Sequence, residues 1–198
     1  MSEMQHVGGE SKIKKDFFEH METSFGRVEK GWRISTPSND VQVVKTTPDY
    51  IVDANIYVSL GLSNSPYPLR NSGRHVRCEL FFILPGECDF LHIPSIIEDV
   101  VTVMEKSGTA FLRGDVIGPK GELFEGHEFT SLYVAPPFLL PDESYGFMIE
   151  GEEVLFMWLV PITTAECEFV RQYGWERFED RLEEMEVDVI NIDRNSVA

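Results

Sequence analysis

The stretch that decides the fold reads Val76-Arg77-Cys78-Glu79-Leu80-Phe81-Phe82-Ile83-Leu84. Every second side chain from Val76 to Leu84 is apolar, which is the two-residue period of a β-strand. Phe81 and Ile83 make the other face apolar as well, as in a strand that enters the core of a sheet. Pro85 ends the run because proline has no N–H to donate to a sheet ladder. The stretch therefore predicts a central strand.

Helical patterns lie on both sides of this strand. Ser11 can cap a first helix, whose apolar side chains recur at helical spacing up to Gly26, a residue that tolerates positive φ. A second helix is expected from the capping box Ser95-x-x-Glu98 to Gly108. Thr163-x-x-Glu166 is another capping box, and it begins a largely helical C-terminal part.

Other β-type runs complete the predicted sheet. They cover residues 32–34, 41–44, 51–60 and 110–134, and a hairpin over 147–160. We expect a single α+β domain over 11–190, in which helices pack on a mostly antiparallel sheet in a sandwich-like arrangement. Residues 1–10 are expected to be a flexible N-terminus, and 191–198 a C-terminal tail.

Composition narrows the class of protein. The 198 residues carry a formal net charge of −17, which repels nucleic acid and anionic membranes and favours a basic protein partner. No apolar run approaches the ~20 residues of a membrane-spanning helix, and no apolar signal region follows the N-terminus. The three cysteines do not suggest a disulfide framework. We therefore expect a cytoplasmic protein.

The acidic excess is concentrated near the end of the chain. Residues 111–198 hold nineteen acidic and six basic residues, a net charge of −13. At helical spacing over 175–186, one side is an apolar stripe made by Trp175, Phe178, Leu182 and Met185. The opposite half is acidic and consists of Glu176, Glu179, Asp180, Glu183, Glu184 and Glu186. Arg177 and Arg181 border the stripe and can pair with these acids.

Two interpretations of the acidic half remain open. It can be the solvated face of a surface helix, or a docking face for a basic protein, since clustered like charge destabilises a fold by self-repulsion. We take the docking face as the predicted partner-binding site.

A second candidate site surrounds residues 61–73, a loop rich in Pro, Asn and Ser whose length is uncommon in compact domains. His75, Arg77 and Glu79 share one strand face directly after it. With Ser63 and Asn64 of the loop they form an alternative binding site for a substrate or partner. The competing interpretation is an Arg–Glu ion pair that satisfies polar groups at a sheet edge.

Motifs for metal binding and catalysis are absent from the sequence. The five histidines show no His-x-x-x-His spacing, and His75 and Cys78 would point to opposite faces of a strand. Cys167 lies among apolar and acidic neighbours that do not activate a thiol. We expect no metal, no cofactor and no catalytic residue. The enzymatic alternative is a hydrolase that uses His75 or His127 near loop 61–73.

Several short motifs resemble the suppressor-of-fused-like domain family. They are Leu60-Gly61-Leu62-Ser63, Arg77-Cys78-Glu79-Leu80, Ala135-Pro136-Pro137-Phe138, Leu159-Val160-Pro161-Ile162-Thr163 with Glu166, and Gly174-Trp175. Their order and spacing over 10–186 carry the resemblance. It implies an α+β sandwich that binds protein. It also implies the bacterial single-domain type, many of which are inferred to be immunity proteins that neutralise toxins.

The animal two-domain member of that family looks like a clamp that grips an extended peptide of a transcription factor by strand addition. Only its first domain corresponds to this chain, so that site is not transferred. The first hypothesis is therefore a bacterial immunity protein that inhibits a basic partner, such as a nuclease toxin, through an acidic surface that steers association. The alternatives are the hydrolase, and a housekeeping scaffold or peptide-binding module that acts by strand addition.

Overall fold

The structure is a computed structural model, and it describes residues 16–36, 40–70, 72–88, 92–149 and 151–198. The predictions for residues 1–10 and for Ser11 lie outside these ranges. Residues 16–25 form the N-terminal helix, which ends at Gly26 with φ of 93° as expected. A Cβ at Gly26 would meet the carbonyl oxygen of Thr47 at 2.4 Å, so the close approach of the two backbones requires glycine.

Within these described ranges, nine strands form one sheet in the order β1-β2-β3-β5-β9-β7-β6, with β4 beside β5 and β8 beside β9. Their bounds are β1 (Arg27–Ser35), β2 (Asp40–Thr47), β3 (Ala54–Leu60), β4 (Tyr67–Pro68), β5 (His75–Pro85), β6 (Val116–Ile117), β7 (Phe129–Ala135), β8 (Gly146–Ile149) and β9 (Glu152–Thr163). Each pair is antiparallel except β5 and β9, which run parallel. The α+β prediction is confirmed.

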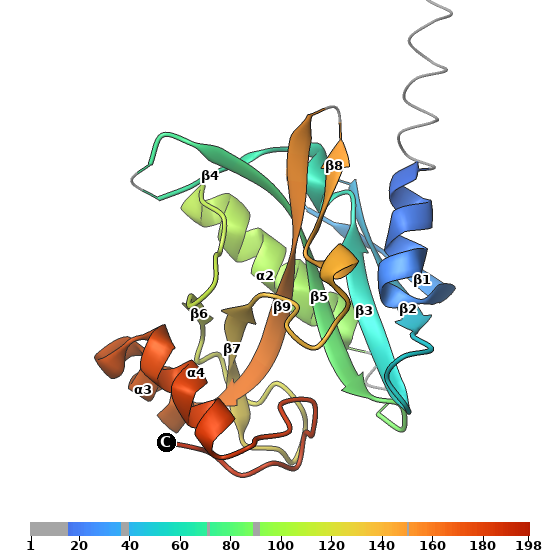
Figure 1. The fold of residues 1–198 in the computed structure, drawn as a ribbon. Coiled ribbons are helices and arrows are strands. Elements are labelled where there is room, and N and C mark those ends of the chain that lie inside the picture. The colour runs from blue at the N-terminus through green and yellow to red at the C-terminus, as the bar shows by residue number, and fades with distance from the viewer. Residues whose placement is uncertain (1–15, 37–39, 71, 89–91, 150) are drawn as a thin grey trace, which may run out of the picture.

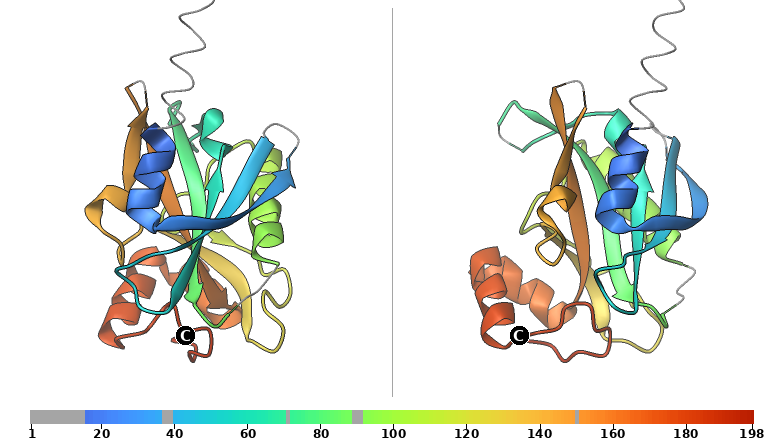
Figure 2. Two further views of the ribbon diagram at one scale, coloured as in Figure 1. Left: turned by 90° about the vertical axis from the view of Figure 1, so that its right-hand side faces the viewer. Right: turned by 45° about the vertical axis from the view of Figure 1, so that its right-hand side comes forward.

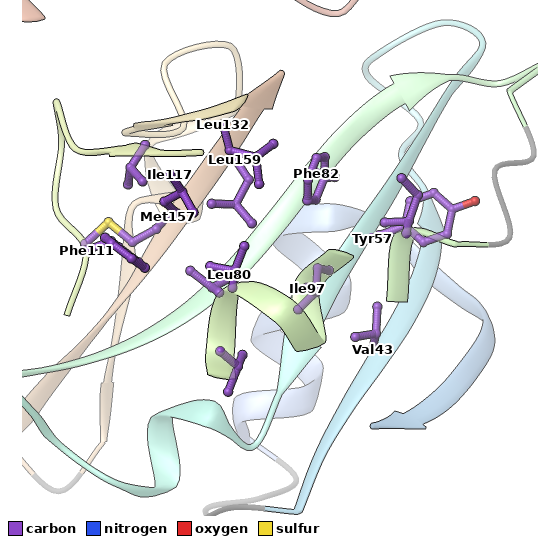
Figure 3. Close-up of a cluster of buried hydrophobic side chains, with 14 of the residues drawn as sticks. Val43, Tyr57, Leu80, Phe82, Ile97, Phe111, Ile117, Leu132, Met157 and Leu159 are labelled. Carbon is purple, nitrogen blue, oxygen red and sulfur yellow. The ribbon is translucent and has the colours of Figure 1, made fainter. Parts of the chain in front are cut away.

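Helices cover both faces of the sheet (Figures 1 and 2). They are the N-terminal helix, α2 (Ile93–Ser107), α3 (Thr164–Tyr173) and α4 (Trp175–Glu184), with single turns η1 (Leu62–Asn64) and η2 (Asp142–Ser144). The two apolar faces of β5 separate two cores. Leu80 and Phe82 pack with Ile97 of α2 (Figure 3), whereas Phe81 and Ile83 pack on the opposite side. The predicted central strand is therefore confirmed on both faces.

The capping box of α3 is confirmed, and that of α2 is wrong. The Thr163 hydroxyl accepts from the Glu166 N–H at 3.2 Å, and the Glu166 carboxylate accepts from the Thr163 N–H at 2.8 Å. Helix α2 instead begins at Ile93, so Ser95 lies within its first turn. Pro94 is compatible with this earlier start. The N–H groups in the first turn of a helix have no acceptor within the helix, so the N–H that proline lacks is not needed there. Only β6 and β7 are strands within 110–134.

The predicted stripe on α4 is correct for Phe178 and wrong for Met185. Phe178 is fully buried against the ring of Tyr133, whereas Met185 is 55% exposed. The helix ends at Glu184, and Glu186 takes a positive φ of 50°. The N–H of Val187 then donates to the Leu182 carbonyl at 3.0 Å, which turns the chain away before Met185 can follow the helical period.

Residues 191–198, assigned to a tail from the sequence, pack against α3 and the sheet. Ile192 and Val197 are buried, and the Arg194 guanidinium donates to both oxygens of the buried Glu166 carboxylate at 2.6 and 3.0 Å. The N–H of Val197 donates to the same carboxylate. Glu166, the third helical residue of the α3 capping box, thus also holds residues 191–198 in place.

Replacing Phe178 by alanine should lower the free energy of unfolding by about 3–5 kcal/mol, because it leaves a cavity under α4. The matched change Met185→Ala removes an exposed side chain and should stay within about 0.5 kcal/mol of the parent. Urea unfolding followed by circular dichroism measures both. Equal effects of the two substitutions would contradict the packing of α4.

Candidate functional site

Glu79 of β5 carries the most densely hydrogen-bonded side chain near loop 61–73. Its carboxylate has no exposed surface. One oxygen accepts from the backbone N–H groups of Gly61 and Ser63, at 2.9 and 3.1 Å, and from the Ser63 hydroxyl at 2.7 Å. The Ser59 hydroxyl bonds the other oxygen at 2.5 Å. The carboxylate therefore fixes the chain from the end of β3 through η1.

Burial and these hydrogen bonds act on the acid in opposite directions. Burial raises the pKa of Glu79, because a charge deep in the protein loses its hydration, and the bonds from Ser59, Ser63 and Gly61 lower it in part. The net direction is upward. Glu79 cannot reach a partner, so its predicted binding role is corrected to that of a loop anchor. Ser63 is also buried, because its N–H and hydroxyl groups donate to the Glu79 carboxylate, so its predicted binding role is corrected in the same way.

Arg77 holds the same loop from the outside. Its Nη1 donates to the carbonyl oxygens of Ser63 and Asn64 at 2.8 and 2.9 Å, and its Nε forms an ion pair with Glu152 of β9. His75, two residues earlier, is exposed. The predicted polar triplet therefore divides into an internal acid, a bridging arginine and one accessible histidine.

A notch opens where the parallel pairing of β5 and β9 stops. The last pair is Arg77 with Val154, while β4 and β8 pair with the outer edges of the two strands. A hollow of about 420 Å³ lies here, lined by Pro66, His75, Val76, Arg77, Glu152 and Glu153. The upper part of Figure 1 shows β4 and β8 leaving on either side of this point. The inner edges of both strands therefore line this hollow.

The acidic half of α4 is the other predicted site, and the structure removes Glu179 from it. Glu179 forms an ion pair with Arg113 and accepts from the Tyr133 hydroxyl at 2.5 Å, so it faces the sheet. Burial raises the pKa of Tyr133, and the neighbouring carboxylate raises it further. The Glu179 side chain therefore joins α4 to β7 and does not face solvent with the other acids.

The other five acids of the predicted acidic half are exposed, four of them on α4 and Glu186 just beyond its end. Within the part of the chain that the structure describes, none of them forms an ion pair; they are Glu176, Asp180, Glu183, Glu184 and Glu186. The arginines expected to neutralise them lie over aromatic rings instead, Arg177 at 6.0 Å from the Tyr173 ring and Arg181 at 5.3 Å from the Phe169 ring. The negative charge is thus left facing solvent.

The candidate groups for metal binding and catalysis are not brought together. Among the described residues, no group of three or more His, Cys, Asp or Glu side chains could hold a metal ion. Cys78 is fully buried, and burial raises the pKa of its thiol to about 12. His127 does not line the notch; its Nδ1 lies 3.1 Å from the Ile192 carbonyl oxygen and 3.4 Å from an Asp193 carboxylate oxygen. In the same described ranges, no helix is long and apolar enough to cross a membrane.

Sequence reasoning placed Glu79 on the right face but missed its burial. The signal was present, since Glu79 is flanked by Cys78 and Leu80 in an otherwise apolar strand, a setting that a lone acid occupies only when it is hydrogen-bonded. The notch could not be found in this way. It depends on which strand pairs with β5.

The sequence model of the suppressor of fused protein (SUFU) family matches residues 35–195. No functionally curated protein is similar enough to this chain to count as a match. A solved suppressor of fused homolog from Neisseria gonorrhoeae FA 1090 has 20% sequence identity and a TM-score of 0.72, with 95% of this chain and 98% of that chain covered.

Two further solved structures share the fold. A chain of a Sufu–Fu complex has 15% identity and a TM-score of 0.67, with 92% of this chain and 91% of that chain covered. Drosophila Suppressor of Fused has 16% identity and a TM-score of 0.67 over 96% of this chain. The match covers 51% of the Drosophila chain, so the present chain spans about half of that protein.

Glu79→Gln should remove one component of the pH dependence of stability. Because the folded-state pKa is raised, the protonated acid stabilises the fold below the unfolded-state pKa near 4.5, and this contribution is lost as pH rises through the folded-state value. The amide does not titrate. The unfolding free energy of the parent, measured relative to Glu79→Gln, should therefore fall as pH rises above about 4.5.

Urea titrations between pH 4 and pH 8 measure this difference. Glu184→Gln, an exposed position, controls for the loss of one negative charge. A parent-minus-variant difference that stays constant with pH would show that folding does not shift the pKa of Glu79, and one that rises with pH would show that folding lowers it; either result contradicts the prediction.

Proposed function

This chain belongs to the suppressor of fused family, and we propose that it is a non-catalytic protein-binding domain that accepts an extended segment of a partner protein between β5 and β9. The observation that carries the proposal is the notch. Two strand edges face one another across a hollow of about 420 Å³, a volume within the usual range of binding pockets. An added strand would gain main-chain hydrogen bonds from both edges.

The walls of the notch are held in place before any partner arrives. Glu79 fixes η1 from inside, and Arg77 fixes the Ser63 and Asn64 carbonyls from outside. A site whose loops are already ordered loses little conformational entropy on binding. This order favours a notch that binds a partner segment over a sheet edge that has no binding role.

The family supports a binding role. A similar fold occurs in a Sufu–Fu complex, in which the related protein is bound to a partner. The two histidines of the enzymatic alternative do not meet at one site, since His75 is exposed at the notch and His127 contacts the C-terminal segment. We therefore propose no catalytic role.

A second candidate function is favoured by α4. Its exposed acids are neutralised neither by Arg177 nor by Arg181, so this face suits a basic protein partner. In this candidate the chain is a cytoplasmic immunity protein that inhibits a basic toxin, such as a nuclease. An acidic face would steer the association, as for other complementary charge pairs.

A partner obtained by affinity capture and identified by mass spectrometry tests the notch. Its binding should slow hydrogen exchange at the backbone amides of 75–77 and 152–154, because strand addition hydrogen-bonds the open edges. Val76→Trp fills the notch and should weaken binding at least tenfold. Val52→Trp, at an 87% exposed turn position, is the matched control. Protection elsewhere, with full binding by Val76→Trp, would place the partner on another surface.

Reversing Glu176, Asp180 and Glu183 to lysine tests the acidic face with the same partner. We expect a slower association rate with the fold intact, because these side chains point to solvent. Raising salt should slow association by the parent more than it speeds dissociation. If neither the rate nor its salt dependence changes, the acidic face only keeps the protein soluble.

A further inference from the structure

The segment between β7 and β8, residues 136–145, is anchored to the core at three points. Pro137, Leu140 and Ser144 are buried. The Ser144 hydroxyl donates to the Ser24 carbonyl of the N-terminal helix at 3.2 Å. We call this segment the β7–β8 loop. Its attachment to both the sheet and a helix limits how far it can move.

Successive turns fix the shape of the β7–β8 loop between these anchors. The N–H groups of Phe138, Leu140, Ser144 and Tyr145 donate to carbonyl oxygens two or three residues earlier, at 2.8–3.1 Å. Pro136, Pro137 and Pro141 restrict φ along the same stretch. The loop is therefore ordered before it meets any partner.

This ordered loop presents large apolar side chains to solvent. Phe138, Leu139 and Tyr145 are 47%, 45% and 42% exposed. The Phe138 ring also lies 5.0 Å from the ring of buried Trp158, so its orientation is set by packing. Single exposed apolar residues are ordinary, but three on one ordered segment, which we call the apolar patch, suit an interaction site.

The β7–β8 loop and α4 cover the same core, because Leu140 of the loop and Phe178 of α4 are buried in one hydrophobic cluster. The Arg113 guanidinium lies 4.3 Å from the centre of the Trp175 ring of α4 and forms the ion pair with Glu179. Figures 1 and 2 show the β7–β8 loop and α4 on the same side of the sheet, opposite α2. The loop and the helix thus contribute to one surface.

Acidic side chains border this surface from both elements. Asp142 and Glu143 are exposed on the loop, and Glu176 and Asp180 on α4. Glu179 neutralises Arg113, and Arg177 and Arg181 of α4 lie over the Tyr173 and Phe169 rings rather than pairing with these acids. The charge therefore matches a basic partner, while the apolar patch requires a large apolar group on that partner.

We propose that Phe138, Leu139 and Tyr145 form, with α4, a docking surface for a basic amphipathic segment of a partner protein. This inference rests on the second candidate function, in which α4 binds a basic protein. It adds an apolar contact that slows the dissociation of that partner. Aromatic residues on ordered elements are typical centres of binding energy, and surrounding charges mainly set the association rate.

A defined probe tests the surface without the natural partner. The probe is a 14-residue amphipathic helical peptide of leucine and lysine, with its leucine–glutamate counterpart as the charge control. Binding is followed by isothermal titration calorimetry. We expect the lysine peptide to bind and the glutamate peptide not to bind. Leu139→Ser and Tyr145→Ser should each weaken binding at least tenfold, and Val52→Ser, at the exposed turn between β2 and β3, should leave it unchanged.

The outcomes separate this inference from the candidate function beneath it. If Glu176→Lys with Asp180→Lys weakens binding but the two loop substitutions do not, the acidic face stands and the apolar docking surface is wrong. Absence of binding to the parent, or an equal loss in Val52→Ser, also overturns the docking surface. The Leu139 side chain is 45% exposed, so its variant reports on docking even if Tyr145→Ser is less stable.

Discussion

The buried carboxylate of Glu79 is the constraint on which the candidate peptide site depends. A carboxylate without access to water is costly unless its oxygens are hydrogen-bonded, and here four donors from Ser59, Gly61 and Ser63 meet it. The same bonds decide where the chain goes after β3. Without them, the loop that forms one wall of the notch would have no fixed position against β5.

The parallel pairing of β5 and β9 determines where the notch opens beside this loop. Because the two strands pair only from Arg77 and Val154 onward, and because β4 and β8 take up their outer edges, their first residues face an open gap. The twelve residues of β9 span about 40 Å. The notch and the acidic helix α4 lie toward opposite ends of this strand, so the two surfaces can act independently.

The acidic residues divide into those with partners inside the protein and those that face solvent. Glu79, Glu166 and Glu179 are acids whose partners lie within the protein, namely backbone donors, Arg194 and Arg113. They hold a loop, the C-terminal segment and α4 in place. The other acids of α4 have no such partners among the described residues, and they leave the exposed face of the helix negatively charged.

Local patterns determined the elements, and tertiary structure decided the site. The alternation from Val76 to Leu84, the capping box of Thr163 and Glu166, and Gly26 could all be interpreted from sequence because the periods and turn chemistry are properties of neighbouring residues. The acidic character of α4 followed from composition in the same way. Burial of Glu79, capture of Glu179 by Arg113 and exposure of Met185 could not be inferred. Each depends on which distant segment lies opposite, and the pairing of β5 with β9 joins residues more than seventy positions apart.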